Sequence, residues 1–212
     1  MKKYQYVLFD WDGNLAKTLD LWLEALRVPL VRRGLHITDE QISDSFGAII
    51  QHMKQWGVKD PEAALEEADA IAQKTLPDVD LYPDALEVLE KLHSLGKQLA
   101  LITTSEHVNV RYLLVKHNLN RFFEVIVAGD DVTNHKPHPE PLEKALTALA
   151  GSKEQAIIIG DSDKDLGAAQ NFGIDSILFY PPEHQKFYNL NNLKELKPTY
   201  IVHDLRQVLK II

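Results

Sequence analysis

Two short acidic segments contain the residue types of a nucleophilic, metal-assisted site. The first segment, Asp10-Trp-Asp12-Gly13, follows the apolar run Tyr6–Phe9. An aspartate held at the end of a strand can act as a nucleophile, because carboxylates form phosphoaspartyl intermediates. A second carboxyl group two residues later can serve as general acid and base, and Gly13 allows a tight turn beside a bound group. Taken alone, the same segment is equally typical of a turn or of a helix N-cap.

The second acidic segment is Gly160-Asp161-Ser-Asp163-Lys-Asp165, and it also follows an apolar run. Carboxylate oxygens are ligands that Mg²⁺ prefers. Aspartates are also common in the first turn of a helix. Capping would explain one of these acids, but not Asp161, Asp163 and Asp165 together in one crevice with Asp10. Such a cluster is repulsive unless cations balance it, so the segment predicts a magnesium site.

Three further residues have side chains suited to an anionic ligand. Lys136 lies in a loop stiffened by two prolines, and it could neutralise Asp10 and hold a phosphoryl oxygen as a point charge. Thr103 ends an apolar run and could donate its hydroxyl to a second phosphoryl oxygen, and we expect its neighbour Thr104 to contact substrate too. Individually, a solvated lysine and a threonine in a turn are the ordinary interpretations.

These residues gain weight from the elements that must position them. Apolar runs alternate with helical stretches in the C-terminal half, which predicts an α/β fold with a Rossmann-like parallel sheet and helices on both faces. Open sheets of this kind bind ligands beyond the carboxyl ends of their strands, where the residues above would meet. The expected strands are Tyr6–Phe9, Leu99–Thr103, Val125–Ala128, Ala156–Gly160, Ser176–Tyr180 and Tyr200–Val202.

The segment between the first two strands reads as helical throughout. One helical face is formed by Leu19, Leu23, Leu26 and Leu30, and further helices are expected at about 39–56, 61–75 and 83–95. A crossover needs only about a dozen residues, so the excess indicates an insert. We predict a catalytic core of residues 1–17 and 81–212 and a helical cap of residues 18–80. In the cap, Gly47 could allow a close approach and Gln51, His52 or Lys54 could contact substrate, although an ordinary amphipathic helix explains each more simply.

Composition narrows the range of functions. The chain has 212 residues, a formal net charge of −8 and no cysteine, which excludes disulfides, thiolate catalysis and cysteine-bound metal centres. The negative balance without a basic run argues against a nucleic-acid partner. No apolar run nears the length of a membrane span, and the first residues lack the apolar centre of a signal peptide. We therefore expect a cytoplasmic protein without membrane contact, a monomer or weak dimer that acts on a small molecule.

The order of the motifs resembles the haloacid-dehalogenase-like hydrolase superfamily, in the phosphatase branch similar to phosphoglycolate phosphatase, which carries a helical cap after its first motif. The resemblance covers essentially the whole chain and rests on Asp10-x-Asp12-Gly13, Thr103 after an apolar strand, Lys136-Pro137, and Gly160-Asp161-Ser162 with Asp165. Three features depart from the pattern. Asn14 replaces a usual threonine, with the turn expected to survive, and His135 replaces a common glycine. Ala16-Lys17-Thr18 stands where Val-Asp-Ser or a similar segment is frequent, and Lys17 could reach an anionic substrate or, more simply, point into solvent.

The resemblance implies a role for each residue. Asp10 would attack phosphorus, Asp12 would act as general acid and base, and Thr103 and Lys136 would hold the phosphoryl group. A Mg²⁺ ion would be bound by Asp10, the main-chain carbonyl of Asp12 and Asp161. Asp165 would support the ion through water or from the second coordination sphere.

The resulting hypothesis is a Mg²⁺-dependent phosphatase that hydrolyses a small phosphorylated metabolite through a phosphoaspartyl intermediate. One alternative is a phosphomutase of the β-phosphoglucomutase type, which would return the phosphoryl group to a sugar. A dehalogenase would need no metal, and the second acidic segment argues against it. From another class, a non-enzymatic phospho-acceptor or binding module also has acids, a threonine and a lysine at strand ends, but it lacks a large insert after its first strand.

Overall fold

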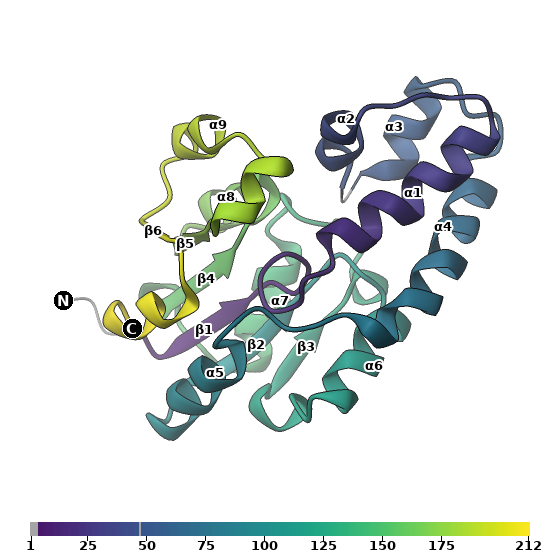
Figure 1. The fold of residues 1–212 in the computed structure, drawn as a ribbon. Coiled ribbons are helices and arrows are strands. Elements are labelled where there is room, and N and C mark those ends of the chain that lie inside the picture. Colours follow the sequence, from purple (N-terminus) through teal and green to yellow (C-terminus); the bar gives the residue numbers. More distant parts are fainter. Residues whose placement is uncertain (1–3, 47) are drawn as a thin grey trace.

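The computed structural model describes residues 4–46 and 48–212; Gly47, a candidate for close substrate approach, lies outside them. Within this part of the chain, six parallel strands form one sheet in the order β3-β2-β1-β4-β5-β6 (Figure 1). The strands are β1 Tyr6–Phe9, β2 Gln98–Ile102, β3 Val125–Val127, β4 Ala156–Gly160, β5 Asp175–Phe179 and β6 Tyr200–Val202. The predicted α/β fold with a parallel sheet is confirmed.

Helices cover both faces of this sheet. The helices of the described chain are α1 Leu19–Arg32, α2 Asp39–Asp44, α3 Ile49–Gln55, α4 Pro61–Thr75, α5 Ala85–Ser94, α6 His107–Lys116, α7 Glu140–Ala148, α8 Asp163–Phe172 and α9 Leu190–Glu195. None of them is long and apolar enough to cross a bilayer.

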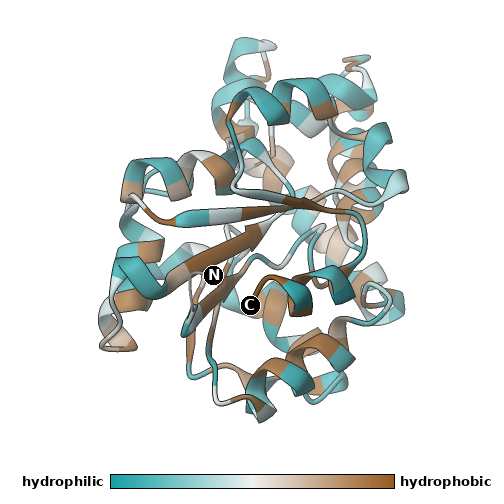
Figure 2. Ribbon diagram, turned by 90° about the vertical axis from the view of Figure 1, so that its left-hand side faces the viewer, coloured by the Kyte–Doolittle hydropathy of each residue, from teal (hydrophilic) through white to brown (hydrophobic). Residues whose placement is uncertain are grey.

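The alternating side chains of the strands separate two apolar layers. In β1, Val7 and Phe9 pack with α5 and α6, whereas Leu8 packs on the opposite face with α7 and α8. The central strands are buried on both faces, as in other parallel sheets with helices on either side, and they colour as hydrophobic ribbon in Figure 2. The buried central strands therefore give a rigid edge from which short loops can project side chains.

Helices α1 to α4 lie beyond the carboxyl edge of the sheet and form an apolar cluster of their own (Figure 1). The expected leucine face of α1 is buried there, where it packs with Ala64, Ala68 and Ala72 of α4. These alanines recur every four residues, so they lie on one face of α4 and allow the two helices to approach closely. Helix α4 begins at Pro61, a residue favoured in the first turn of a helix.

The prediction of a single helix at about 39–56 is wrong, because the structure has two helices there. Helix α2 ends at Asp44 and α3 begins at Ile49. At the end of α2, the Ser45 hydroxyl donates to the Ile42 carbonyl at 2.6 Å, and the Ser43 hydroxyl donates to the Asp39 carbonyl at 2.9 Å. Serine side chains that bond to the local backbone in this way compete with helix continuation, and the apolar periodicity alone did not show the break.

The chain passes between the sheet and helices α1–α4 twice, and the two passages pair with each other. The Lys17 N–H donates to the Asp80 carbonyl and the Tyr82 N–H donates to the Leu15 carbonyl, both at 2.9 Å. Ala16 and Leu81 form an antiparallel bridge between them. Through this pairing, two adjacent extended segments, before α1 and after α4, connect helices α1–α4 to the sheet.

Candidate active site

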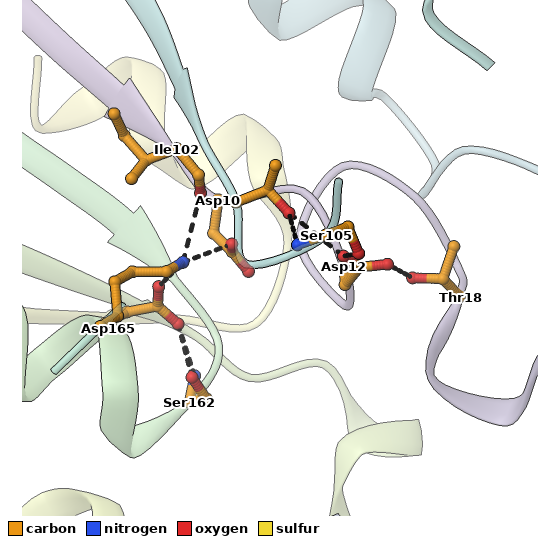
Figure 3. Close-up of polar contacts among 9 residues, drawn as sticks. Asp10, Asp12, Thr18, Ile102, Ser105, Ser162 and Asp165 are labelled. Atoms are coloured by element: carbon orange, nitrogen blue, oxygen red, sulfur yellow. Dashed lines mark hydrogen bonds and ion pairs between the residues drawn. The ribbon is translucent and has the colours of Figure 1, made fainter. Parts of the chain in front are cut away.

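A buried lysine joins two carboxylates at the carboxyl edge of the sheet. The Lys136 Nζ lies 2.6 Å from Asp10 Oδ1 and 2.6 Å from Asp165 Oδ1, and it also donates to the Ile102 carbonyl at 3.2 Å (Figure 3). Asp10 ends β1, Lys136 follows β3, and Asp165 lies in the first turn of α8. Both Lys136 and Asp10 are only 5% exposed. The charge of the lysine therefore interacts with these two carboxylates and not with solvent.

A third carboxylate, Asp161, completes a group that can bind a cation. Asp10, Asp161 and Asp165 each offer one oxygen, and these oxygens lie within 4.8 Å of one another. Burial and the charge of Asp165 raise the pKa of Asp10 to about 8. Burial and the charge of Asp10 raise the pKa of Asp161 well above its usual value. One lysine cannot neutralise three carboxylates, so the group fits a divalent cation with oxygen ligands.

Asp163, the other acid of the second segment, lies outside this group. Its carboxylate is exposed and binds Lys164 at 2.8 Å. Asp165, by contrast, has two tasks: its Oδ1 contacts Lys136, and its Oδ2 accepts from the Ser162 hydroxyl at 2.6 Å in a capping box at the start of α8. Asp165 therefore both caps helix α8 and belongs to the carboxylate group that could bind a metal.

The Asp12 side chain is not one of the three carboxylates of this group and is held by four described side chains. Its Oδ1 accepts from the Thr18 hydroxyl at 2.7 Å and from the Trp22 indole N–H at 2.9 Å. Its Oδ2 accepts from the Ser105 hydroxyl at 2.7 Å and from the Thr103 hydroxyl at 3.3 Å. Figure 3 shows Asp12 between Thr18 and Ser105. The Asp12 carboxylate is thus oriented from the sheet on one side and from α1 on the other.

Sequence reasoning missed three of these four donors. Ser105 could have been suspected, since it continues the polar run that begins at Thr103. Thr18 and Trp22 lie four residues apart on consecutive turns of α1, but nothing in their types indicates an active site. Thr103 is buried and its hydroxyl also accepts from the Ser105 N–H at 3.0 Å. Thr104, the other threonine of the pair, lines the neighbouring cavity.

Gly13 is required by the close approach of Asp161. Its φ is +74°, and a Cβ at this position would lie 2.2 Å from Asp161 Oδ2. The turn around it is held by the main chain, because the Leu15 and Ala16 N–H groups both donate to the Trp11 carbonyl at 3.1 Å. The turn thus forms with Asn14 in place of threonine, although the buried Asn14 amide has no hydrogen-bond partner within the described residues.

A cavity of about 1080 Å³ opens over these groups between the sheet edge and helices α1–α4. Its floor includes Asp10, Asp12, Lys136 and Asp161. The opposite wall includes the apolar side chains Leu19, Trp22, Leu26, Phe46, Ile49, Ile50 and Leu65, and the same helices add the polar side chains Ser43, Gln51, Lys54, Gln55 and Asp69.

Some of the expected polar contacts reach this cavity and others do not. Gln51 and Lys54 line it, and so does His135, which was not expected to contact substrate. The His52 ring contacts the Trp56 ring in a tilted arrangement, with ring centroids 5.7 Å apart. Lys17 lies over the Tyr82 ring, 5.3 Å from its centroid.

Comparisons with known proteins agree with this arrangement. The family profile described as haloacid dehalogenase-like hydrolase matches residues 7–179. Pyrophosphatase PpaX of Halalkalibacterium halodurans is 29% identical over 97% of this chain and 95% of its own length.

Solved structures show the same fold. A haloacid dehalogenase-like family hydrolase from Streptococcus pneumoniae superposes with a TM-score of 0.84 at 23% identity, covering 100% of this chain and 99% of that one. CbbY from Rhodobacter sphaeroides, solved in complex with phosphate, gives a TM-score of 0.78 at 20% identity, covering 97% of this chain and 96% of the other.

Proposed function

This chain belongs to the haloacid dehalogenase-like hydrolase family, and from that premise we propose that it is a Mg²⁺-dependent phosphatase acting on a small phosphorylated metabolite through a phosphoaspartyl intermediate. The observation that carries the proposal is the Lys136 bridge between Asp10 and Asp165, with Asp161 beside them. A hydrolase that uses a carboxylate nucleophile on an anionic substrate needs such fixed positive charge.

Asp10 is the proposed nucleophile. Its Oδ1 is held by Lys136, and its second oxygen is the atom that would attack phosphorus as the bond to the leaving oxygen breaks. Mg²⁺ bound by Asp10, Asp161 and the main-chain carbonyl of Asp12, with Asp165 in support, would neutralise the charge of the phosphoryl oxygens. Lys136, Thr103 and Thr104 would hold the same group, with Lys136 acting as a point charge.

Asp12 is the proposed general acid and base. It would give a proton to the leaving oxygen as the phosphoaspartyl bond forms, and then take a proton from the water that attacks this bond. Free phosphate and a regenerated Asp10 carboxylate result. The carboxylate of Asp12 is separate from the cluster of Asp10, Asp161 and Asp165, and its four hydrogen-bond donors hold it at the cavity floor. These positions support different roles for the two aspartates, with Asp10 as nucleophile and Asp12 as general acid and base.

Residues 18–80 are the proposed cap, which would close over the bound substrate and exclude water. Two features support this assignment. Helices α1–α4 form an apolar cluster separate from the two layers on the sheet, and they are connected to the sheet by two extended segments that pair with each other. The cap would then supply the wall that contacts the organic part of the substrate.

The cavity wall favours an organic phosphate monoester over pyrophosphate, the substrate named for the PpaX relative. Seven apolar side chains, with several polar ones between them, line the wall opposite the carboxylates, and pyrophosphate has no apolar atoms to place against the apolar ones. The cationic side chains Lys54 and Lys164 also line the cavity, but each is paired with an acid, Glu62 at 3.2 Å and Asp163 at 2.8 Å. A monoester with a partly apolar carbon skeleton uses the whole cavity.

Phosphate release tests the proposal. The purified protein would be assayed with pyrophosphate, phosphoglycolate, a hexose 1-phosphate and nucleoside monophosphates, with Mg²⁺ or with EDTA. We expect Mg²⁺-dependent release from organic monoesters with a higher kcat/KM than from pyrophosphate. A preference for pyrophosphate would instead indicate that Lys54 and Lys164 bind a second phosphate. Conversion of hexose 1-phosphate to hexose 6-phosphate without free phosphate would indicate a phosphomutase.

A further inference from the structure

A buried histidine lies directly behind the proposed metal site. His184 belongs to the 3₁₀ turn Pro182–Lys186 that follows β5, and it is 0% exposed. Its imidazole is surrounded by four aromatic rings, those of Tyr82, Phe179, Tyr180 and Tyr188, with centroids 5.6–6.0 Å away. Neither the sequence motifs nor the proposed mechanism gives this residue a role.

The two ring nitrogens of His184 face different partners. The Nε2 lies 2.7 Å from the Tyr82 hydroxyl, a hydrogen bond between buried groups. The Nδ1 faces Asp161 Oδ2 at 3.8 Å, which is longer than a hydrogen bond. Both Nδ1 and Oδ2 are buried without a hydrogen-bond partner in the described part of the chain.

The surroundings select one tautomer of the ring. A neutral imidazole carries a single N–H, on one ring nitrogen or on the other. An Nδ1 lone pair turned toward the Asp161 carboxylate would place two acceptors against each other in a buried site. The favourable arrangement has the Tyr82 hydroxyl donating to Nε2 and the Nδ1–H directed at Asp161.

The second oxygen of Asp161 has few other options. Oδ2 lies only 2.2 Å from the position that a Cβ of Gly13 would occupy. The Gly13 backbone therefore covers one side of this oxygen. His184 closes another. Within the described residues, His184 turns its Nδ1 toward this oxygen, which leaves the other oxygen of the carboxylate for a cation.

We propose that His184 is a positioning residue that donates its Nδ1–H to Asp161 and thereby orients this carboxylate toward the divalent cation. The inference rests on the magnesium site of the proposed function. Carboxylates that bind metals are commonly held by such outer hydrogen bonds, and their loss typically lowers metal affinity about 10- to 100-fold. Because Tyr82 lies in the segment that leads from α4 back to the sheet and pairs with the segment before α1, the same chain of contacts joins the metal site to this connection.

Two substitutions separate positioning from simple packing. In His184→Asn the side-chain amide can place a donor near the position of Nδ1, whereas in His184→Gln the donor falls near the position of Nε2. We expect the Gln variant to bind Mg²⁺ about 10- to 100-fold more weakly and the Asn variant to retain most of the affinity, as measured by calorimetry and by electron paramagnetic resonance of bound Mn²⁺. Steady-state kinetics should show a raised Mg²⁺ requirement for the Gln variant, with kcat restored at saturating Mg²⁺.

Phe179→Leu is the matched control, since Phe179 contacts the same imidazole edge-on at 5.7 Å without a polar group. It should lower the melting temperature and leave Mg²⁺ affinity unchanged. Equal losses of affinity in the Asn and Gln variants, or no loss in either, would overturn the role of His184. A wild-type protein that binds no divalent cation would overturn the magnesium site itself, and the inference with it.

If either variant does not fold, the wild-type protein still decides the question. Long-range ¹H–¹⁵N spectra distinguish the two histidine tautomers, and His184 can be identified by its contacts with the Tyr82 and Phe179 rings. We expect protonation at Nδ1 and a shift of this nitrogen on addition of Mg²⁺. Protonation at Nε2 would contradict the proposal.

Discussion

Asp10 is the residue at which the proposed chemistry is most directly testable. Asp10→Asn keeps the shape of the side chain and an oxygen for Lys136, but it removes the charge needed for attack on phosphorus. We expect phosphate release to fall to background, while stability is kept because one member of a repulsive carboxylate group is neutralised. Circular dichroism and urea unfolding check the fold, and retained turnover would reject Asp10 as the nucleophile.

For Lys136, in contrast to Asp10, we expect substitution to lower the stability of the protein. Lys136→Met would leave Asp10 and Asp165 buried without their counter-charge, and removal of one partner from a buried ion pair costs about 3–5 kcal/mol. Urea unfolding of the metal-free protein at neutral pH measures this cost. Lys91→Met, on the exposed side of α5, is the control and should change the free energy of unfolding by less than about 0.5 kcal/mol.

At this scale, the sequence was most informative where chemistry dictates residue type. Asp10, Lys136 and Asp161 could be located because each follows an apolar run that predicts a parallel strand, and such strands end at one edge. The partners of Asp12 could not be found in the same way. A tryptophan on a helix is typical of a core residue, and only the orientation of α1 directs its indole N–H toward Asp12. His184 was missed for the same reason, since its position depends on the path of the chain after β5.

Helix α1 is the element that connects the proposed cap to the general acid and base. Trp22→Phe removes the indole N–H that donates to Asp12 Oδ1 while keeping an aromatic ring at the cavity wall. A hydrogen bond to a charged group contributes about 1.5–3 kcal/mol, so we expect kcat/KM to fall by about 10- to 100-fold through a poorly oriented Asp12. Trp56→Phe, in the same group of helices but in tilted ring contact with His52, should leave kcat/KM unchanged. If both variants behave alike, the effect comes from packing and not from Asp12.

Strands and helices were predictable to different degrees. Every expected strand forms, with ends within one residue, because a buried parallel strand is a continuous apolar run bounded by polar residues. Helix α4 also has its expected bounds, from Pro61 to Thr75. The segment 39–56 failed because its apolar spacing continues across a break that Ser43 and Ser45 produce through their own backbone contacts. Periodicity reports which residues are buried, and local side-chain hydrogen bonds decide where a helix stops.

For the whole molecule, the carboxylate group links stability to pH and to metal. In the metal-free protein the pKa of Asp10 is raised from 3.8 to about 8. Between these values the folded state holds a proton that the unfolded chain has lost, so the free energy of unfolding decreases as pH rises through this window. Asp161, whose pKa is raised in the same direction, adds to the effect.

A divalent cation should reverse this trend, because it binds the ionised carboxylates and competes with their protons. We expect Mg²⁺ to raise the melting temperature more at about pH 8 than at about pH 5, with a stabilisation of about 2.7 kcal/mol when its concentration is 100 times the dissociation constant. Scanning calorimetry with Mg²⁺ and with EDTA at both pH values measures the difference. Asp10→Asn should reduce both the pH dependence and the gain from Mg²⁺, since it removes one titrating ligand. An equal gain at both pH values would mean that the cation binds away from Asp10 and Asp161, and the proposed mechanism would then lose its metal site.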